Sequence, residues 1–167
     1  IEKLEVFICL NKNLIMNLFE DSNEWADKLA PILTKYKGKK HPLEYQNLYQ
    51  LMVLVVLSAQ ASDANINKMA PTLFEVYPNM ESLSVSNVEA LIPHISKVRN
   101  FGIKANWLIE IAQTIQKDKN IPLTMEGLTA LKGIGRKSAN VIMREANISA
   151  QGIIADLHVI RVAPKIG

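Results

Sequence analysis

The sequence LKGIGRKSANV, residues 131–141, contains two glycines two positions apart, followed by an arginine and a lysine. Apolar residues at helical spacing lie on both sides of it, so two helices must be joined by a turn of about four residues. Gly133 and Gly135 supply backbone angles that a side chain would forbid, and we expect the turn to need both. The turn also leaves unpaired N–H groups at a helix N-terminus. Lys132 and Arg136 add positive charge there, which predicts a phosphate site.

Three interpretations of this turn compete. A nucleotide-binding P-loop needs a glycine, four residues and then Gly-Lys-Ser/Thr, but Arg136 separates Gly135 from Lys137, so the spacing excludes it. A purely structural helical hairpin stays open, because Gly-x-Gly turns are common. A clamp for a nucleic-acid backbone is favoured over both, because positive charge and unpaired amides coincide at one point.

Helical spacing recurs along the chain and strand-like alternation is scarce, which predicts an all-α protein. The segment Leu48–Leu57 is apolar on nearly every side, so we expect a central helix surrounded by others. An amphipathic helix is also predicted from Trp25 to Tyr36. Two further helix starts are predicted, one with Ser62 or Asp63 as its N-cap and one with Ser86 and Glu89 as a capping box. Another helix is predicted from near Ile103 to the segment NIP (120–122). A short helix is predicted from Thr124 to about Leu131, and the next helix is predicted to start near Arg136.

Composition narrows the class of protein further. The 167 residues are 49% hydrophobic, which suits one domain or two lobes that share a core. The single cysteine, Cys9, can form no intrachain disulfide and no cysteine-ligated metal site by itself, which favours an intracellular setting. The longest apolar run, Leu51–Leu57, is far shorter than the roughly 20 residues of a membrane span. A net charge of +3 permits a polyanionic partner without requiring one.

Three segments together resemble the endonuclease III-like branch of the helix-hairpin-helix (HhH-GPD) DNA glycosylases. They are LSAQASDANINK (57–68), LKGIGRKSANVI (131–142) and IIADLHVIRV (153–162), which occur in the order and approximate spacing of that family. The resemblance implies two helical lobes with a DNA-binding cleft between them. We expect one lobe at 41–147, with the helix-hairpin-helix at about 125–146, and the second from 1–40 plus 148–167, truncated at its C-terminus.

The resemblance also implies a catalytic pair. Lys137 matches the lysine that attacks C1′ of the damaged nucleotide, and Asp156 matches the carboxylate that assists it. Only a neutral amine can attack, and at the ordinary lysine pKa of about 10.4 few are neutral at pH 7. Lys137 falls in the first turn of a helix beside Arg136, where the dipole and a like charge oppose a further positive charge. Asp156 can also cap a helix that starts at Leu157.

Other residues match the DNA-contacting positions of the family. Gln60 corresponds to the polar plug that fills the space left by a flipped nucleotide, although it can instead cap local backbone. Asn100 lies near the position where relatives often carry an apolar residue. Three interpretations stay open: Phe101 takes over as the wedge, the wedge is weak, or Phe101 is an ordinary core aromatic. His158 is expected to make a structural or DNA-backbone contact. In the hairpin, the expected DNA-binding residues are Lys132, Gly133, Ile134, Gly135 and Arg136.

This sequence departs from the family at several positions. Lys132 replaces the usual hairpin proline, and Ala155 and Leu157 flank Asp156 where valine and threonine are frequent. Many relatives bind a [4Fe-4S] cluster through four cysteines that follow the segment RVAPKIG (161–167). We expect no metal and no cofactor in this chain, and such a cluster only if a longer product supplies those cysteines.

The expected function is a base-excision-repair DNA glycosylase with AP lyase activity, acting on oxidised pyrimidines in duplex DNA through a lysine Schiff base and β-elimination. The expected partner is damaged double-stranded DNA, and we expect an intracellular monomer without membrane contact. Two alternatives stay open. One is a glycosylase that only removes bases, and the other is a non-catalytic helix-hairpin-helix DNA-binding module in which Lys137 and Asp156 have no chemical role.

Overall fold

The computed structural model describes residues 27, 30–31, 34–35, 41–149, 151 and 157–166. The chain divides into two compact units, residues 1–41 and 42–167. In the first unit the described residues 27, 30–31 and 34–35 are helical, as predicted for Trp25 to Tyr36. The expected grouping of 1–40 with 148–167 in one lobe stays a prediction.

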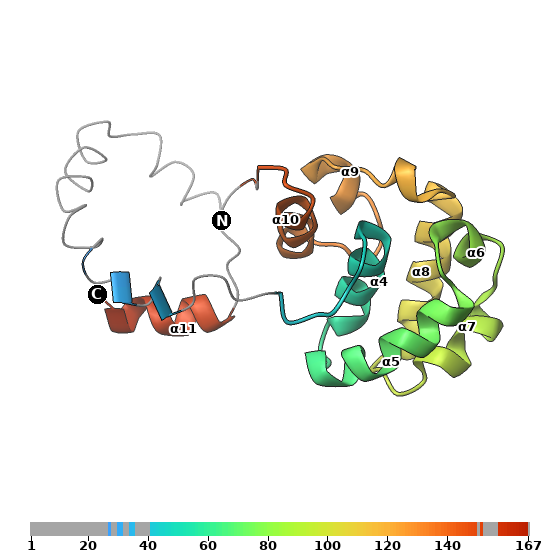
Figure 1. Ribbon diagram of the computed structural model, residues 1–167, viewed down its shortest axis with the longest axis horizontal. Coiled ribbons are helices and arrows are strands. Elements are labelled where there is room, and N and C mark those ends of the chain that lie inside the picture. Colours follow the sequence, from blue (N-terminus) through green and yellow to red (C-terminus); the bar gives the residue numbers. More distant parts are fainter. Residues whose placement is uncertain are drawn as a thin grey trace. The chain divides into compact units, whose positions relative to one another are not determined.

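Every regular element among the described residues of the second unit is a helix, which confirms the all-α class. The elements, which Figure 1 shows in chain order, are α4 (Leu48–Ser58), α5 (Asp63–Val76), α6 (Met80–Ser84), α7 (Val88–Ile95), α8 (Phe101–Ile115), the short 3-10 helix η1 (Asp118–Asn120), α9 (Met125–Thr129), α10 (Arg136–Glu145) and α11 (Leu157–Ile166).

Helix α4 is the centre of the core, as its sequence predicts. All of its residues from Tyr49 to Leu57 are buried. It lies between α10 on one side and α5 with α8 on the other (Figure 1). Each fully buried Leu, Val or Met side chain contributes roughly 1.5–3 kcal/mol, so a helix that is apolar all round is stable only in this position. The C-terminal end of α4 is therefore fixed in position by the packing of the helix against its neighbours.

The helix caps agree with the sequence in part. Ser62 caps α5 as predicted, with its side chain accepting a hydrogen bond from the N–H of Asn65. The predicted capping box of Ser86 and Glu89 is wrong, because the N-cap of α7 is Asn87, which accepts from the N–H of Ala90. The Ser86 hydroxyl instead lies 3.0 Å from the phenol oxygen of Tyr77. The Ser86 hydroxyl thus makes a tertiary contact with Tyr77 instead of capping α7.

Helix α8 begins earlier and ends earlier than the sequence suggested. It starts at Phe101 rather than near Ile103, directly after Asn100 in the left-handed conformation. It ends at Ile115, where Gln116 takes φ 64° and donates its N–H to the carbonyl of Ala112, so the helix stops before the predicted segment NIP. Among the described helices, α8 packs against α4, α6 and α7.

Helices α9 and α10 form the predicted hairpin. Thr124 caps α9, with its hydroxyl accepting from the N–H of Gly127 at 3.1 Å, and α10 begins at Arg136 as expected. α10 packs on both α9 and α4. At its far end, the phenol of Tyr45 donates a hydrogen bond to Glu145, and burial with this contact raises the pKa of Tyr45 to about 12.

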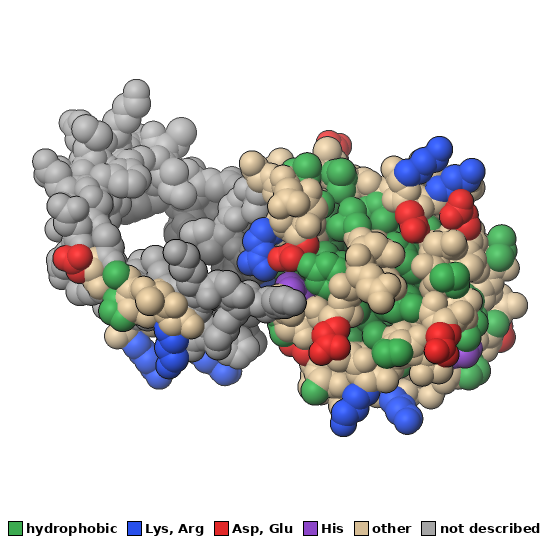
Figure 2. Space-filling view, viewed as in Figure 1, with side chains coloured by type: hydrophobic (Ala, Val, Ile, Leu, Met, Phe, Trp, Pro, Cys, Tyr) green, Lys and Arg blue, Asp and Glu red, His purple; other side chains and the backbone are tan. Residues whose placement is uncertain are grey.

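The surface of the second unit carries mixed charge. On the face seen in Figure 2, acidic and basic side chains are interspersed around hydrophobic ones. Within the described part of the chain, no helix is both long and apolar enough to cross a membrane.

Candidate functional site

Gly133 is the residue of the hairpin turn with a left-handed backbone conformation. It adopts φ 79°, and a Cβ atom built on it would lie 2.5 Å from Cε3 of Trp107 on α8. Both the backbone angle and the packing therefore require glycine. The next residue, Ile134, is only 4% exposed and its side chain lies in the core. Any contact that Ile134 makes with a ligand must therefore come from its main chain.

Gly135 differs, and the expectation that the turn needs both glycines for their backbone angles is wrong. Its φ of −91° is open to any residue, and a Cβ there would meet no atom within 4 Å. Gly135 is the N-cap of α10, and it has no side chain to accept from the first N–H groups. The missing side chain leaves open space over a helix N-terminus, where an anion can approach closely.

Three cationic residues lie in the hairpin turn and the first turn of α10. Arg136 and Lys137 are the first two residues of α10, and both are exposed. The ammonium of Lys132 lies 3.0 Å from a carboxylate oxygen of Glu110 on α8, in an exposed ion pair. Lys132 is thus tethered to α8, while the α10 cations stand directly at the helix end.

Two of the predicted site residues cannot be compared with Lys137 in this structure. Asp156 lies outside the described residues, so its meeting with Lys137 stays a prediction. His158 lies on α11, but its side chain is outside what the structure describes. The structure does show how the chain leaves α10 towards this segment: Asn140, 3% exposed, accepts from the N–H of Gln151 at 2.8 Å and donates to its carbonyl at 3.2 Å.

Sequence reasoning missed Asn140, although a signal for it exists. It stands three residues before Met143 and next to Ala139, on the apolar side of α10. A buried polar side chain keeps its place only with partners, and Asn140 finds them on the main chain of Gln151. This contact fixes the chain five residues ahead of Asp156.

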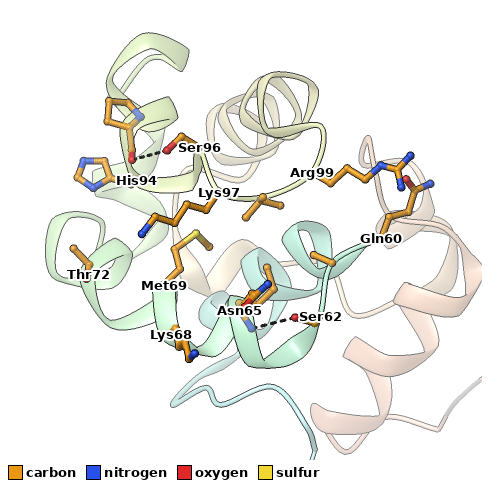
Figure 3. Close-up of a pocket in the computed structure, with 14 residues that line it drawn as sticks. Gln60, Ser62, Asn65, Lys68, Met69, Thr72, His94, Ser96, Lys97 and Arg99 are labelled. Atoms are coloured by element: carbon orange, nitrogen blue, oxygen red, sulfur yellow. Dashed lines mark hydrogen bonds between the residues drawn. The ribbon is translucent and has the colours of Figure 1, made fainter.

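Gln60 lies on the short turn between α4 and α5. It is exposed and has φ 59°, which is uncommon for a residue with a side chain. It forms one end of a pocket of about 750 Å³ between α5 and the loop after α7. Figure 3 shows Arg99 and Gln60 extending towards one another, with Lys97 and Lys68 further along. Among the described residues that line it, none is acidic.

Asn100 and Phe101 stand at the start of α8. Asn100 has φ 59° and caps the helix without a side-chain hydrogen bond, so its side chain is available for other contacts. Phe101 is 38% exposed and is therefore not an ordinary core aromatic. Asn100 and Phe101 thus both lie at the surface, at a bend like that of Gln60.

A second missed residue, Lys104, lies between these two bends. It is 2% exposed, and its ammonium reaches the C-terminal end of α4. Its signal in the sequence is a lysine on the apolar stripe of α8, four residues before Leu108 and seven before Ile111.

A glycine hairpin that presents a basic helix N-terminus, within an all-helical domain, defines a helix-hairpin-helix protein. The chain belongs to the HhH-GPD superfamily of base excision DNA repair proteins, whose family description matches residues 53–167. The expected family and helix-hairpin-helix fold are thereby confirmed.

Curated relatives agree with this assignment. The chain is 34% identical to the endonuclease III of Synechocystis sp. over 145 residues, which are 85% of this chain and 66% of that protein. It is 30% identical to the endonuclease III of Escherichia coli over 141 residues, which are 81% of this chain and 66% of that protein. The chain thus spans about two thirds of the length of these relatives.

Solved structures give the same picture. A trapped endonuclease III–DNA covalent intermediate with an estranged adenine superposes with a TM-score of 0.75 at 29% identity, covering 84% of this chain and 67% of that one. A thermostable thymine-DNA glycosylase superposes with a TM-score of 0.73 at 17% identity, covering 85% of this chain and 68% of that one, and so shares the fold.

The residues of this chain do not fit an iron–sulfur cluster. Such a cluster takes several cysteine thiolates, and Cys9 is the single cysteine of residues 1–167. Within the ranges that the structure describes, no group of three or more His, Cys, Asp or Glu side chains could hold a metal ion.

Proposed function

We propose that this chain carries a DNA glycosylase of base excision repair that is also an AP lyase, acting on oxidised pyrimidines in duplex DNA. One observation carries the proposal: Lys137 stands exposed in the first turn of α10, directly after the open N-cap Gly135. A DNA backbone that contacts this helix end would lie next to an amine. The trapped covalent intermediate of the related endonuclease III is in keeping with such chemistry.

The proposed reaction uses the neutral amine of Lys137 as nucleophile. Its lone pair forms a bond to C1′ while the bond from C1′ to the base breaks, and the base leaves with those electrons. Opening of the sugar ring gives an imine between Lys137 and C1′. Loss of a proton from C2′ then expels the 3′ phosphate, which is β-elimination, and water releases the lysine. Asp156 is proposed to accept the lysine proton and to stabilise the positive sugar.

The nucleotide must leave the helix before this attack. Gln60 is proposed to fill the space that it leaves, and Asn100 with Phe101 to part the neighbouring bases. The cations of the pocket at Gln60 support this role, because they can contact the phosphates of the strand that stays in place.

Trapping with borohydride tests the lyase. Reduction of the imine leaves a stable bond between Lys137 and the sugar, so the natural full-length protein should form a covalent adduct with a duplex that carries an abasic site. Lys137→Gln should abolish the adduct, and Lys119→Gln, an exposed lysine in η1, should leave it unchanged. A duplex with an oxidised pyrimidine should also yield the adduct if the protein removes that base.

Three other outcomes separate the alternatives. An adduct that survives in Lys137→Gln would contradict the assigned nucleophile. Base release without an adduct would identify a glycosylase that only removes bases. DNA binding that weakens with rising salt, without base release or adduct on any substrate, would leave only the binding module.

A further inference from the structure

Lys104 is a buried cation whose partners are main-chain carbonyls. It is 2% exposed in the first turn of α8, and its Nζ atom donates to the carbonyls of Leu57 at 2.8 Å and Ala59 at 2.5 Å. These carbonyls lie at the C-terminal end of α4, where the helix dipole favours positive charge. Burial, and after it the charge of Arg99, lowers the pKa of Lys104 from its ordinary value. An ammonium is costly to bury, so its position calls for a reason.

Lys104 contacts both bends that carry the proposed plug and wedge. Its ammonium holds Ala59, the residue directly before Gln60. Its backbone N–H makes the ordinary helical hydrogen bond to the carbonyl of Asn100 at 3.1 Å, so the Lys104 side chain starts one helical turn after the wedge. One residue thus spans from the plug to the wedge, although Leu57 and Lys104 are 47 positions apart in the chain.

Both bends are left-handed and exposed, and the one at Gln60 is strained, so neither is fixed by burial. Gln60 and Asn100 each have φ 59°, and each is exposed. A residue with a side chain pays of the order of 1–2 kcal/mol in this conformation and keeps it only where its surroundings hold it. The two hydrogen bonds that the Lys104 ammonium donates to the carbonyls of Leu57 and Ala59 fix the backbone directly before Gln60.

We propose that Lys104 is a positioning residue that fixes the plug Gln60 relative to the wedge Asn100 and Phe101, so that both enter the duplex together. The proposal rests on the proposed function. Lys104 itself touches no DNA and takes no part in the chemistry. It acts through the turn 58–60, and its effect should appear only where a nucleotide must be held out of a duplex.

The test compares duplex and single-stranded substrates. Single-stranded DNA with an abasic site needs no plug, because no opposite strand has to be kept apart. Lys104→Met retains the apolar stem and removes the donor. It should lower the rate of borohydride-trapped adduct formation on the duplex by roughly tenfold to a hundredfold relative to the single strand. Lys117→Met, at an exposed position, should leave the ratio of the two rates unchanged.

A double variant separates positioning from a merely structural role. Gln60→Ala should lower the same ratio, and adding Lys104→Met to it should cause little further loss, because both changes remove one function. A purely structural lysine would lower both rates alike, in proportion to the folded fraction, and an unchanged ratio would overturn the proposal. Lys104→Gln, which retains a shorter donor, replaces Lys104→Met if that variant does not fold.

A second measurement keeps this proposal distinct from the proposed function. A fluorescent adenine analogue brightens when it is unstacked. Placed opposite a tetrahydrofuran analogue of the abasic site, which has no C1′ hydroxyl and cannot form the imine, it reports insertion of the plug and wedge without any chemistry. The wild-type protein should brighten it and Lys104→Met should not. A wild type that brightens the probe but forms no adduct would end the lyase proposal and leave the positioning role standing. Equal brightening by both proteins would end the positioning role.

Discussion

The hairpin turn and the two bends that carry the proposed plug and wedge change the direction of the chain by different means. At the hairpin, the left-handed residue is Gly133, with Trp107 packed where a side chain would be. At the other two bends the left-handed residues are Gln60 and Asn100, whose side chains are exposed. Glycine serves where only the direction of the chain matters. Gln60 and Asn100 keep an exposed side chain at such a bend, whereas Gln116, with φ 64°, adopts the same region only to end α8 and has no proposed contact with DNA.

The largest expected effect lies at the glycine itself. Gly133→Ala should lower the free energy of unfolding by about 2–4 kcal/mol, because it adds left-handed strain and overpacks against the Trp107 ring. Urea denaturation measures the loss as a lower midpoint.

The matched control for this change is Gly135→Ala. Its backbone is in an ordinary conformation and its Cβ meets open space, so its stability should stay within about 0.5 kcal/mol of wild type. Its affinity for duplex DNA should fall, because the new methyl group stands where the phosphate approaches. Equal losses of stability in both variants would remove the distinction between the two glycines.

A smaller effect is expected at the other end of the hairpin, where a buried side chain rather than a backbone angle holds the next segment. Asn140→Ala leaves the N–H and carbonyl of Gln151 without their partner, which should cost about 1–3 kcal/mol of unfolding free energy. Asn106→Ala is the control, because Asn106 is exposed and bonds only within its own helix, to Gly102. A loss no greater than that of the control would show that the Asn140 contact does not hold the segment.

The smallest effect has the opposite sign. Gln60→Gly should raise the unfolding free energy by about 0.5 kcal/mol, because glycine adopts φ 59° without strain. Gln60→Ala retains the strain and should give no gain in denaturation experiments. Both variants should lose adduct formation on duplex DNA. If the alanine variant gains as much as the glycine variant, the bend is not strained and the comparison with Gly133 fails.

Much of this fold can be predicted from the sequence, because most of its helices are marked by residues close together in the chain. The burial of α4 follows from an apolar run with no polar side, and the start of α10 follows from the glycines before Arg136. The family motifs supplied the order of plug, hairpin and lysine. The Ser86 cap failed because a tertiary contact with Tyr77 competes for the same hydroxyl, and nothing near Ser86 in the sequence indicates it.

The site contacts that sequence reasoning missed are long-range ones. The stripe of α8 marks Lys104 as buried, but its acceptors are carbonyls of another helix, which no side-chain pattern records. The two glycines look alike in the sequence, and the backbone angle together with the ring of Trp107 distinguishes Gly133 from Gly135. Asp156 and His158 keep their roles as predictions, from the motif alone.

The 47-residue separation of Leu57 and Lys104 also bears on the order in which the site forms during folding. Closing a long loop costs more chain entropy than closing a short one, and the α9–α10 hairpin closes through only a few residues. This cost favours a sequence of events in which the glycine hairpin forms first and the plug and wedge come together last. A complete chain that refolds would then present its proposed phosphate-binding turn before it acquires the means to open a duplex.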